Sequence, residues 1–466
     1  MSFIFSTFAA IFSNSVIMKR KIYDTLLTWK QKEHGRVALL IEGARRVGKS
    51  YIAEELARNE YKSYILIDFA HITKPIKRVF DDYLEDTDVF LRYLQTVTQT
   101  KLYERESIII FDEIQLYPRA RQAIKHLVAD GRYDYIETGS LVGIMSSAED
   151  ILEPSEERSI TMQPMDFEEF LWAIGDEMTM PLVRDCYQKC QPLGPAHRPT
   201  MDLFRHYLII GGMPQAILKW IETKDFQAVD VAKRDVLSIY RRSIGKYAKN
   251  YAHKVRAVFD QIPEELQKHE KRFCLADIDE KARMRSYETA FFWLKDAQMT
   301  NLCYGITEPT PGMRLKRNGN TFKCYMSDTG LLISHAFDEK DIQGLELYQK
   351  LLLDKLEFNE GMLVENIVAQ MLVASGHSLY FYSNTDKKET ENRMEIDFLV
   401  EKHVLTNRHN IYPIEVKSGK NYTLSSLQKF VTKFHEQVTT PIVLHSDDVK
   451  QQNDITYLPL YMTPLL

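Results

Sequence analysis

Cysteine is scarce in this sequence, and its spacing excludes both a disulfide framework and a zinc site. Five cysteines are spread over 466 residues, and only Cys186 and Cys190 lie close together. No second pair of Cys or His residues completes a tetrahedral zinc set. We therefore expect free, buried thiols, which are typical of the reducing cytoplasm, and a cytoplasmic protein.

The sequence also lacks a long apolar segment beyond its first residues. Residues 1–17 are uncharged, but they have no basic start like that of a signal peptide and are marginal in length for a membrane span. We interpret them as a flexible extension ahead of Met18, with a membrane anchor as the alternative. Because no other segment is long enough to cross a bilayer, no membrane is expected among the partners.

An excess of positive charge is missing as well. The formal net charge is -5, which excludes a uniformly basic nucleic-acid coat but leaves room for a local basic groove. Hydrophobic residues make up 44% and charged residues 27%, as in ordinary soluble globular proteins. The length predicts roughly three domains.

The strongest motif is RVALLIEGARRVGKSYIAEELA, residues 36–57. An apolar strand runs into Gly43, Gly48, Lys49 and Ser50 in the spacing G-x-x-x-x-G-K-S, and a helical pattern begins at once. The glycines let backbone N–H groups cradle phosphate oxygens at a helix N-terminus. We expect Lys49 to reach the β- and γ-phosphates of a nucleotide and Ser50 to bind Mg²⁺, since a chance glycine turn would not need this context.

The stretch ESIIIFDEIQ, residues 106–115, supplies an acidic pair after a second apolar strand. A parallel strand beside the first would bring Asp112 near Mg²⁺ and Glu113 to a place where it can polarise a water molecule. Such a pair is weak evidence by itself. Together with the upstream loop it predicts ATP hydrolysis with a dedicated base.

A third apolar segment, YDYIETGSLVG, covers residues 133–143 and ends in small polar side chains. In a sheet built of βα units, the end of this strand would place Thr138 or Ser140 near the γ-phosphate. The alternative is that these hydroxyls only cap the next helix.

Five segments in this order resemble the AAA+ ATPases of bacteria and archaea that carry a C-terminal domain of unknown function. They are GARRVGKS, IIIFDEIQ, IETGS, ITMQPMDFEEFL and YLIIGGMPQAI. The resemblance extends from Met18 to the C-terminus and implies a P-loop AAA+ ATPase domain with ATP and Mg²⁺ as cofactors. It also implies that Arg158 acts as an arginine finger on the ATP of a neighbouring subunit in an oligomer. The usual Gly before this Arg is Glu157 here, and a solvated surface Arg is the alternative.

These motifs together predict one nucleotide site. We assign Ser50 and Asp112 to the metal, and Lys49 and Glu113 to catalysis. The residues expected to bind the nucleotide are Gly43, Gly48, Lys49, Ser50, Tyr51, Ser140 and Arg158.

The middle of the chain is mostly helical and ends in a helix and a hairpin. Residues 286–307 have helical spacing and then switch to a strand, and residues 322–332 are predicted as the returning strand. A helix followed by a hairpin is typical of a winged helix, as in the resembled family. Its basic side chains would contact DNA phosphates, form a solvated turn or pack against the ATPase domain. They are Arg314, Lys316 and Arg317, and Arg241 and Arg242 are equally ambiguous.

Acidic residues recur on three predicted elements near the C-terminus. FNEGMLVENIVAQML is an amphipathic helix with Glu365, and RMEIDFLVE is a strand with Asp397. IYPIEVKSGK is the returning strand. Because side chains alternate along a strand, its Glu415 and Lys417 point to the same face.

The order E, D and E-x-K resembles the PD-(D/E)xK nuclease fold, although Ile396 replaces the usual Pro. In that chemistry carboxylates hold Mg²⁺ ions that polarise a phosphodiester, and the Lys handles the attacking water. The resemblance implies that Glu365, Asp397 and Glu415 bind metal, and that Asp397, Glu415 and Lys417 are catalytic. The fold also serves as a degenerate binding platform. A surface pair of Glu415 and Lys417 is the plainest alternative.

We predict an α/β protein with three modules after a flexible extension at 1–17. They are a P-loop AAA+ ATPase domain (18–222), a helical winged-helix domain (223–340) and a restriction-endonuclease-like α/β domain (341–466). The leading function is ATP hydrolysis coupled to the engagement or cleavage of DNA. The alternatives are a signalling ATPase whose inactive C-terminal domain binds a protein partner, and a nucleotide-binding scaffold that does not hydrolyse ATP.

Overall fold

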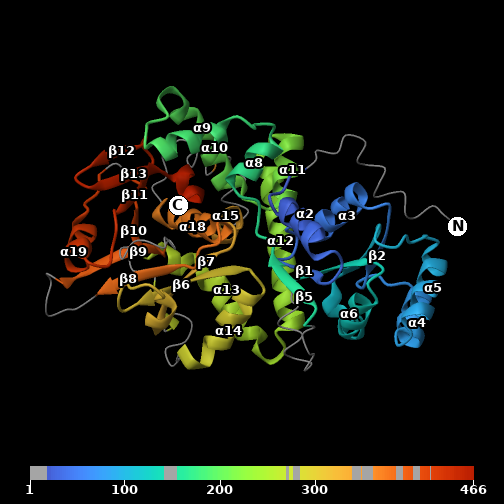
Figure 1. Cartoon of the computed structure of the whole chain (residues 1–466). Helices are drawn as coiled ribbons and strands as arrows, with labels where there is room; N and C mark the ends of the chain where they lie inside the picture. Colours follow the sequence, from blue (N-terminus) through green and yellow to red (C-terminus); the bar gives the residue numbers. More distant parts are fainter. Residues whose placement is uncertain are drawn as a thin grey trace.

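The computed structural model of the chain describes residues 18–140, 155–268, 272–275, 284–337, 348, 360–384, 392–401, 410–419 and 421–466. The predicted extension at 1–17 and the predicted boundary at 340/341 lie outside these residues. Each half of the molecule contains one β-sheet, and helices including α12 lie between the two sheets (Figure 1). Among the described helices, none combines the length and the apolar character that a membrane crossing requires.

The N-terminal sheet is parallel, with the strand order β2-β3-β4-β1-β5. In that order the strands are Ser63–Asp68, Ser107–Asp112, Asp134–Gly139, Ala38–Glu42 and Glu157–Thr161. The helices around it are α2 (Ile22–Glu33), α3 (Lys49–Glu60), α4 (Lys74–Tyr83), α5 (Thr87–Thr98) and α6 (Pro118–Asp130). The predicted P-loop α/β domain with a parallel sheet is therefore confirmed.

Burial on both faces explains the unbroken apolar run in β3. Ile108 and Ile110 belong to one hydrophobic core together with residues of α2 and α3. Their neighbours Ile109 and Phe111 belong to a second core with residues of α4, α5 and α6. Since alternate side chains enter different cores, the four central positions, Ile108 to Phe111, are all apolar, and Asp112 follows at the end of the strand.

Helices connect the two sheets. They are α8 (Phe167–Ala173), α9 (Thr179–Lys189), α10 (His197–Ile210), α11 (Pro214–Thr223), α12 (Phe226–Tyr247), α13 (Ala252–Gln267) and α14 (Met284–Asp296). The longest of these is α12, which begins where the Asp225 carboxylate accepts hydrogen bonds from the first backbone N–H groups. It passes between the N-terminal sheet and the C-terminal half (Figure 1).

The C-terminal sheet has the strand order β12-β13-β11-β10-β9-β8-β6-β7. In chain order the strands are β6 (Thr300–Ile306), β7 (Arg317–Met326), β8 (Tyr380–Asn384), β9 (Met394–Glu401), β10 (Ile411–Val416), β11 (Ile442–His445), β12 (Lys450–Gln452) and β13 (Ile455–Pro459). Helices α15 (Thr329–Ala336), α18 (Glu360–Ala374) and α19 (Ser425–Lys433) accompany them. The hairpin predicted as a wing is β6 and β7, and β6 pairs in parallel with β8. One sheet thus contains strands from both sides of the predicted boundary at 340/341, and the winged helix stays a prediction.

The predicted strand over residues 322–332 is only half right. The strand ends at Met326, and α15 begins at Thr329. The reason is Asp328, whose carboxylate accepts a hydrogen bond from the N–H of Leu331 at 2.8 Å and so caps a new helix. Leu331 and Leu332 are fully buried on that helix.

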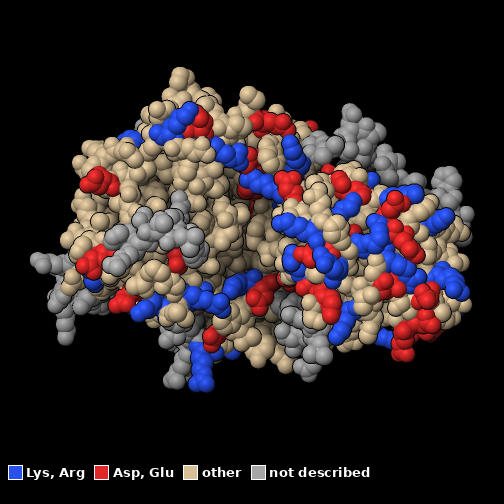
Figure 2. Space-filling model, viewed as in Figure 1, with Lys and Arg blue, Asp and Glu red and all other residues tan. Residues whose placement is uncertain are grey.

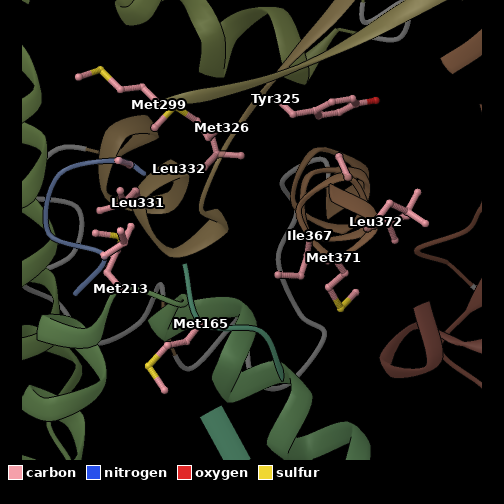
Figure 3. Packing of buried hydrophobic residues seen from close by; sticks show 14 of the residues in the cluster. Met165, Met213, Met299, Tyr325, Met326, Leu331, Leu332, Ile367, Met371 and Leu372 are labelled. Carbon is pink, nitrogen blue, oxygen red and sulfur yellow. The ribbon is translucent and has the colours of Figure 1, made fainter. Parts of the chain in front are cut away.

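The two halves meet where backbone approaches backbone without room for side chains. A Cβ atom at Gly212 would overlap the carbonyl oxygen of Met165, and one at Gly330 would overlap the carbonyl oxygen of Ile210. Gly211 has a φ of +84° and faces the carboxylate of Asp328. The motif GGM is therefore a packing requirement. Around it, methionines and leucines from α15, α18 and the segment before α8 form one buried cluster (Figure 3).

Replacing Gly212 by Ala is expected to destabilise the protein by roughly 1–3 kcal/mol, because the new methyl group would have to displace backbone. Gly245 in α12 is the matched control, since nothing lies within 4 Å of a Cβ built there. Gly245→Ala is expected to leave stability unchanged or to raise it by up to about 1 kcal/mol. Thermal unfolding of the two variants measures the difference, and equal midpoints would contradict the packing argument.

Candidate nucleotide site and C-terminal acidic cluster

The loop between β1 and α3 has the geometry of a phosphate cradle. Gly48 has a φ of +100°, and α3 begins directly after it at Lys49. A Cβ at Gly43 would lie 2.5 Å from the carbonyl oxygen of Met162, so only glycine allows this close approach. The backbone N–H groups at the start of α3 are left free of helical partners and suit an anion.

Lys49 lies in the middle of this cradle and is 6% exposed. Its Nζ donates to the carbonyl oxygens of Gly43 and Ala44, both at 3.0 Å. Burial lowers the pKa of Lys49 to about 8, against the opposing effect of Glu113 and Asp112. The ammonium therefore has carbonyl dipoles as partners and no carboxylate in hydrogen-bond contact, which leaves its charge for an anionic ligand.

The predicted metal ligands are brought together. The Ser50 hydroxyl donates to Oδ1 of Asp112 at 2.6 Å, and the Thr138 hydroxyl donates to the same oxygen. Burial raises the pKa of Asp112, and the two hydroxyls oppose that shift. A hydroxyl and a carboxylate at the edge of the phosphate cradle are hard oxygen donors, so these residues fit Mg²⁺.

Glu113 occupies a constrained position beside this pair. Its backbone has a φ of +54°, and its N–H donates to the Thr138 hydroxyl at 3.4 Å. The side-chain amide of Gln115, which is 4% exposed, donates to the Glu113 carboxylate. The predicted base is thus held at the mouth of the cradle. Thr138, which the sequence pattern indicates together with Ser140 for a place near the γ-phosphate, contacts both Asp112 and Glu113.

A pocket of about 1060 Å³ opens over the cradle. Its floor contains Lys49, Ser50, Tyr51, Asp112 and Glu113, and α11 and α12 cover it. The lining residues from these two helices are Pro214, Gln215, Leu218, Lys219, Glu222, Ile239, Arg242, Ser243, Lys246 and Tyr247. The three cations of this lid, Lys219, Arg242 and Lys246, suit a polyphosphate, and the spacing of the sequence motifs had not placed them here.

The remaining predicted residues have different positions. Ser140 accepts a hydrogen bond from Nε of Arg45 at 3.2 Å, and Arg45 also reaches the Tyr247 hydroxyl at 3.5 Å. Arg158 forms an ion pair with Glu33 at 2.8 Å and is absent from the pocket lining. A role of Arg158 toward a neighbouring subunit remains a prediction.

The four predicted residues of the C-terminal site also converge. Glu365 lies on α18, Asp397 on β9 and Glu415 on β10, and β9 and β10 are antiparallel neighbours. Oδ2 of Asp397 accepts the N–H of Val416 at 2.9 Å, and Nζ of Lys417 lies 2.7 Å from Oε1 of Glu415. Burial and the nearby Asp397 raise the pKa of Glu415 to about 8.

The sequence interpretation missed the centre of this cluster. Lys323, from the edge strand β7, has a side chain that is 1% exposed. Its Nζ lies 2.9 Å from Glu395, 3.8 Å from Glu365 and 3.8 Å from Asp397. Throughout the described ranges, no three His, Cys, Asp or Glu side chains are arranged to hold a metal ion. At the C-terminal cluster the ammonium of Lys323 lies between Glu365 and Asp397, two of the predicted metal ligands. Only the pattern F-K-C-Y, with a Lys inside an apolar strand, could have drawn attention to Lys323.

Two of the three basic residues of the predicted wing contact neighbouring side chains within the protein. The Arg317 guanidinium lies 3.8 Å from the ring centre of Tyr304, and Lys316 pairs with Glu308 at 3.0 Å. Arg241 pairs with Asp260 at 3.2 Å. On the face in Figure 2, basic and acidic side chains are interspersed over the ATPase half, with no continuous basic surface there. DNA contact by these residues remains a prediction.

Three family models match separate parts of the chain. Residues 35–171 match an AAA domain. Residues 201–341 match one domain of unknown function (DUF8612), and residues 360–462 match another (DUF4143). The first match and the loop geometry together show an AAA-type, ATP-binding ATPase domain in the N-terminal part of the chain.

Solved structures with distant similarity were also found. A Walker-type ATPase of Pyrococcus abyssi is 16% identical, with 69% of this chain and 96% of that chain covered and a TM-score of 0.44. The ORC1 protein of Aeropyrum pernix in complex with DNA is 11% identical, with 72% of this chain and 97% of that chain covered and a TM-score of 0.29. Cdc6p from Pyrobaculum aerophilum is 13% identical, with 75% of this chain and 98% of that chain covered and a TM-score of 0.27. No curated protein matches the sequence.

The pKa of about 8 for Lys49 predicts that ATP binding depends on pH. Anionic phosphates favour the ammonium form, so binding raises this pKa and takes up a proton. Between pH 7 and pH 9 the affinity for ATP is expected to fall by about tenfold, with an uptake of about half a proton near pH 8. Calorimetry with EDTA, in buffers of different ionisation enthalpy, measures both.

Lys49→Arg is the control, because a guanidinium stays charged over this range. Whatever binding remains in that variant is expected to show no proton uptake. If the wild type binds ATP equally well at both pH values, Lys49 does not hold the phosphates in this way.

Proposed function

We propose that this chain is a Mg²⁺-dependent ATPase that passes its nucleotide state to its C-terminal domain. The observation that carries the first half is the contact between Ser50 and Asp112 at 2.6 Å, beside Glu113 and inside a phosphate cradle. A bound Mg²⁺ ion would be held by these two oxygens and would neutralise phosphate charge. Lys49 would hold the β- and γ-phosphates, and Glu113 would accept the proton of the attacking water.

Gln115 has a specific place in this scheme. Its amide N–H donates to Glu113, while its Oε1 atom is buried with no hydrogen-bond partner among the described residues. The Gln115 side chain thus donates to the Glu113 carboxylate through its amide N–H, while its own Oε1 stays available as an acceptor. We propose that this contact orients the base toward the pocket before ATP arrives.

The second half of the proposal starts at the wall of the nucleotide pocket. Pro214, at the first position of α11, lines the pocket, and Gly212 lies two residues before it. The Gly212 N–H donates to the fully buried carboxylate of Asp328 at 2.5 Å. Because Asp328 caps α15, a movement of α11 over the nucleotide would act directly on the start of that helix.

From α15 the contacts continue to α18. Oε1 of Gln370 accepts the backbone N–H of Thr329 at 2.8 Å and its hydroxyl at 3.0 Å. The Gln370 amide donates to the Tyr207 hydroxyl, which in turn donates to the carbonyl oxygen of Met165 at 2.8 Å. All these groups are buried, so each bond lost in a rearrangement must be replaced.

The path ends at the acidic cluster. Asn366 on α18 bonds both backbone groups of Met326 and the hydroxyl of Thr329. The next residue toward the N-terminus of α18 is Glu365, which accepts from the Tyr325 hydroxyl at 3.1 Å. A shift of α18 would therefore change the cluster around Lys323. The described members of this cluster, four acids and two lysines, favour a protein partner over the DNA phosphate backbone.

Metal-dependent cleavage of DNA by the C-terminal domain is the second candidate. The observation that favours it is the convergence of Asp397, Glu415 and Lys417 on two adjacent strands. It requires a divalent ion between Asp397 and Glu365, where the ammonium of Lys323 now lies.

Glu113→Gln is expected to lower phosphate release from Mg²⁺-ATP by at least about 100-fold, because an amide cannot accept the proton of water. ATP binding is expected to stay within a few-fold of wild type. The matched control is Glu106→Gln, which changes an exposed Glu just before β3 that pairs with Lys62. Persistent hydrolysis in Glu113→Gln would rule out the proposed base.

Gln370→Leu tests the coupling without touching the pocket. Hydrogen exchange of α18 is measured in the Glu113→Gln background, with and without Mg²⁺-ATP. We expect ATP to change exchange in α18 by a factor of about 5 or more, and Gln370→Leu to remove that response. The control is Gln95→Leu, which removes from α5 an amide whose Oε1 accepts the N–H of Leu102; this variant should keep the response. Identical responses in the two variants would show that this path does not carry the coupling, whatever the outcome for hydrolysis.

A further inference from the structure

The cluster at the C-terminal site is built around a buried ammonium group. Lys323 is one of the least exposed charged residues of the described chain, and its Nζ lies within 4 Å of three carboxylates. A buried ammonium requires acidic partners. Glu365, Glu395 and Asp397 surround Nζ at 3.8, 2.9 and 3.8 Å and supply that counter-charge.

The lysine is placed by the sheet. Lys323 pairs with Cys303 in the β6–β7 hairpin, at the edge of the C-terminal sheet. Tyr325, two residues on, points to the same face and donates to Oε2 of Glu365. That oxygen is also the one facing Lys323 at 3.8 Å. Strand β7 thus presents two side chains to a predicted metal ligand.

A metal ion at this place would meet the ammonium at short range. Mg²⁺ or Mn²⁺ lies at about 2.1 Å from its oxygen ligands. An ion bound to Oε2 of Glu365 or Oδ1 of Asp397 could thus be at most about 6 Å from Nζ of Lys323. Glu415, the third predicted ligand, is turned to Lys417 at 2.7 Å.

We infer that Lys323 takes the place of a divalent metal ion between Glu365 and Asp397, so that the C-terminal cluster is complete without a metal. Its role is that of an internal counter-ion supplied by the hairpin. The domain then keeps the arrangement of helix α18 and strands β9 and β10 as a binding platform and does not cleave phosphodiesters. The inference is independent of ATP hydrolysis, because it concerns a cluster that nucleotide does not touch.

Titration of the full-length, EDTA-treated protein with MnCl₂ in the absence of nucleotide tests this inference. Wild type and Asp397→Asn are expected to give the same heats, since no ion binds at Asp397. Lys323→Met, which removes the charge and keeps the apolar stem, is expected to gain a Mn²⁺ site at least tenfold tighter than any in the wild type. That gain should disappear in Lys323→Met/Asp397→Asn, and Mn²⁺ should raise the unfolding temperature of Lys323→Met alone.

The wild-type comparison decides the matter even if Lys323→Met does not fold. Mn²⁺ binding by the wild type that Asp397→Asn removes would overturn the inference. Nicking of a supercoiled plasmid by the wild type with Mn²⁺, again lost in Asp397→Asn, would overturn it as well. Asp112→Asn serves as the control that separates binding at the nucleotide site from binding at this cluster.

Discussion

The relative arrangement of the two halves depends on the hydrogen bonds that the carboxylate of Asp328 accepts. It is fully buried, accepts the N–H of Gly212 at 2.5 Å and caps α15 through the N–H of Leu331 at 2.8 Å. Burial raises the pKa of Asp328, and these two hydrogen bonds oppose that shift. A buried carboxylate without donors would cost several kcal/mol, so the loop and the helix start must stay together. The absence of side chains at Gly211 and Gly330 follows from this contact.

Buried lysines show how the same residue type serves opposite purposes in this molecule. Lys49 is bonded to two carbonyl oxygens, and burial lowers its pKa to about 8. Lys233 is bonded to the carbonyl oxygen of Ile209, and burial lowers its pKa to about 8 too. Lys323 has three carboxylates around it, which raise its pKa. An ammonium with dipoles as partners has charge to offer to a ligand, whereas one surrounded by acids is already neutralised. Of these lysines, only Lys49 faces an open pocket.

The nucleotide site could be predicted because its chemistry is local in sequence. The glycines, Lys49 and Ser50 lie within eight residues, and Asp112 ends a strand whose apolar run marks it as central. What the sequence could not supply was the lid, since Arg242 and Lys246 reach the pocket only because α12 folds back over it. The same limit applies to the C-terminal cluster. Its helix and two strands follow from the periodicity of apolar residues. Its central residue, Lys323, comes from a hairpin that the sequence pattern places in the predicted winged-helix domain.

Lys323 forms ion pairs between two segments of the chain that match different family models. The lysine lies within residues 201–341 and its acidic partners within residues 360–462, which match different family models. The sheet is continuous across them, because β6 pairs with β8 at Tyr304 and Tyr380. If the segments separated, Glu365, Glu395 and Asp397 would lose their common counter-ion, and Lys323 would lose both its acidic partners and the Phe381 ring, whose centre lies 5.0 Å from its Nζ. Removing either partner within the intact fold would leave an uncompensated buried charge, which costs more than exposing an apolar side chain of similar size. The hairpin is therefore bound to the C-terminal sheet by charge as well as by backbone hydrogen bonds, and α18 shares in this contact because it carries Glu365.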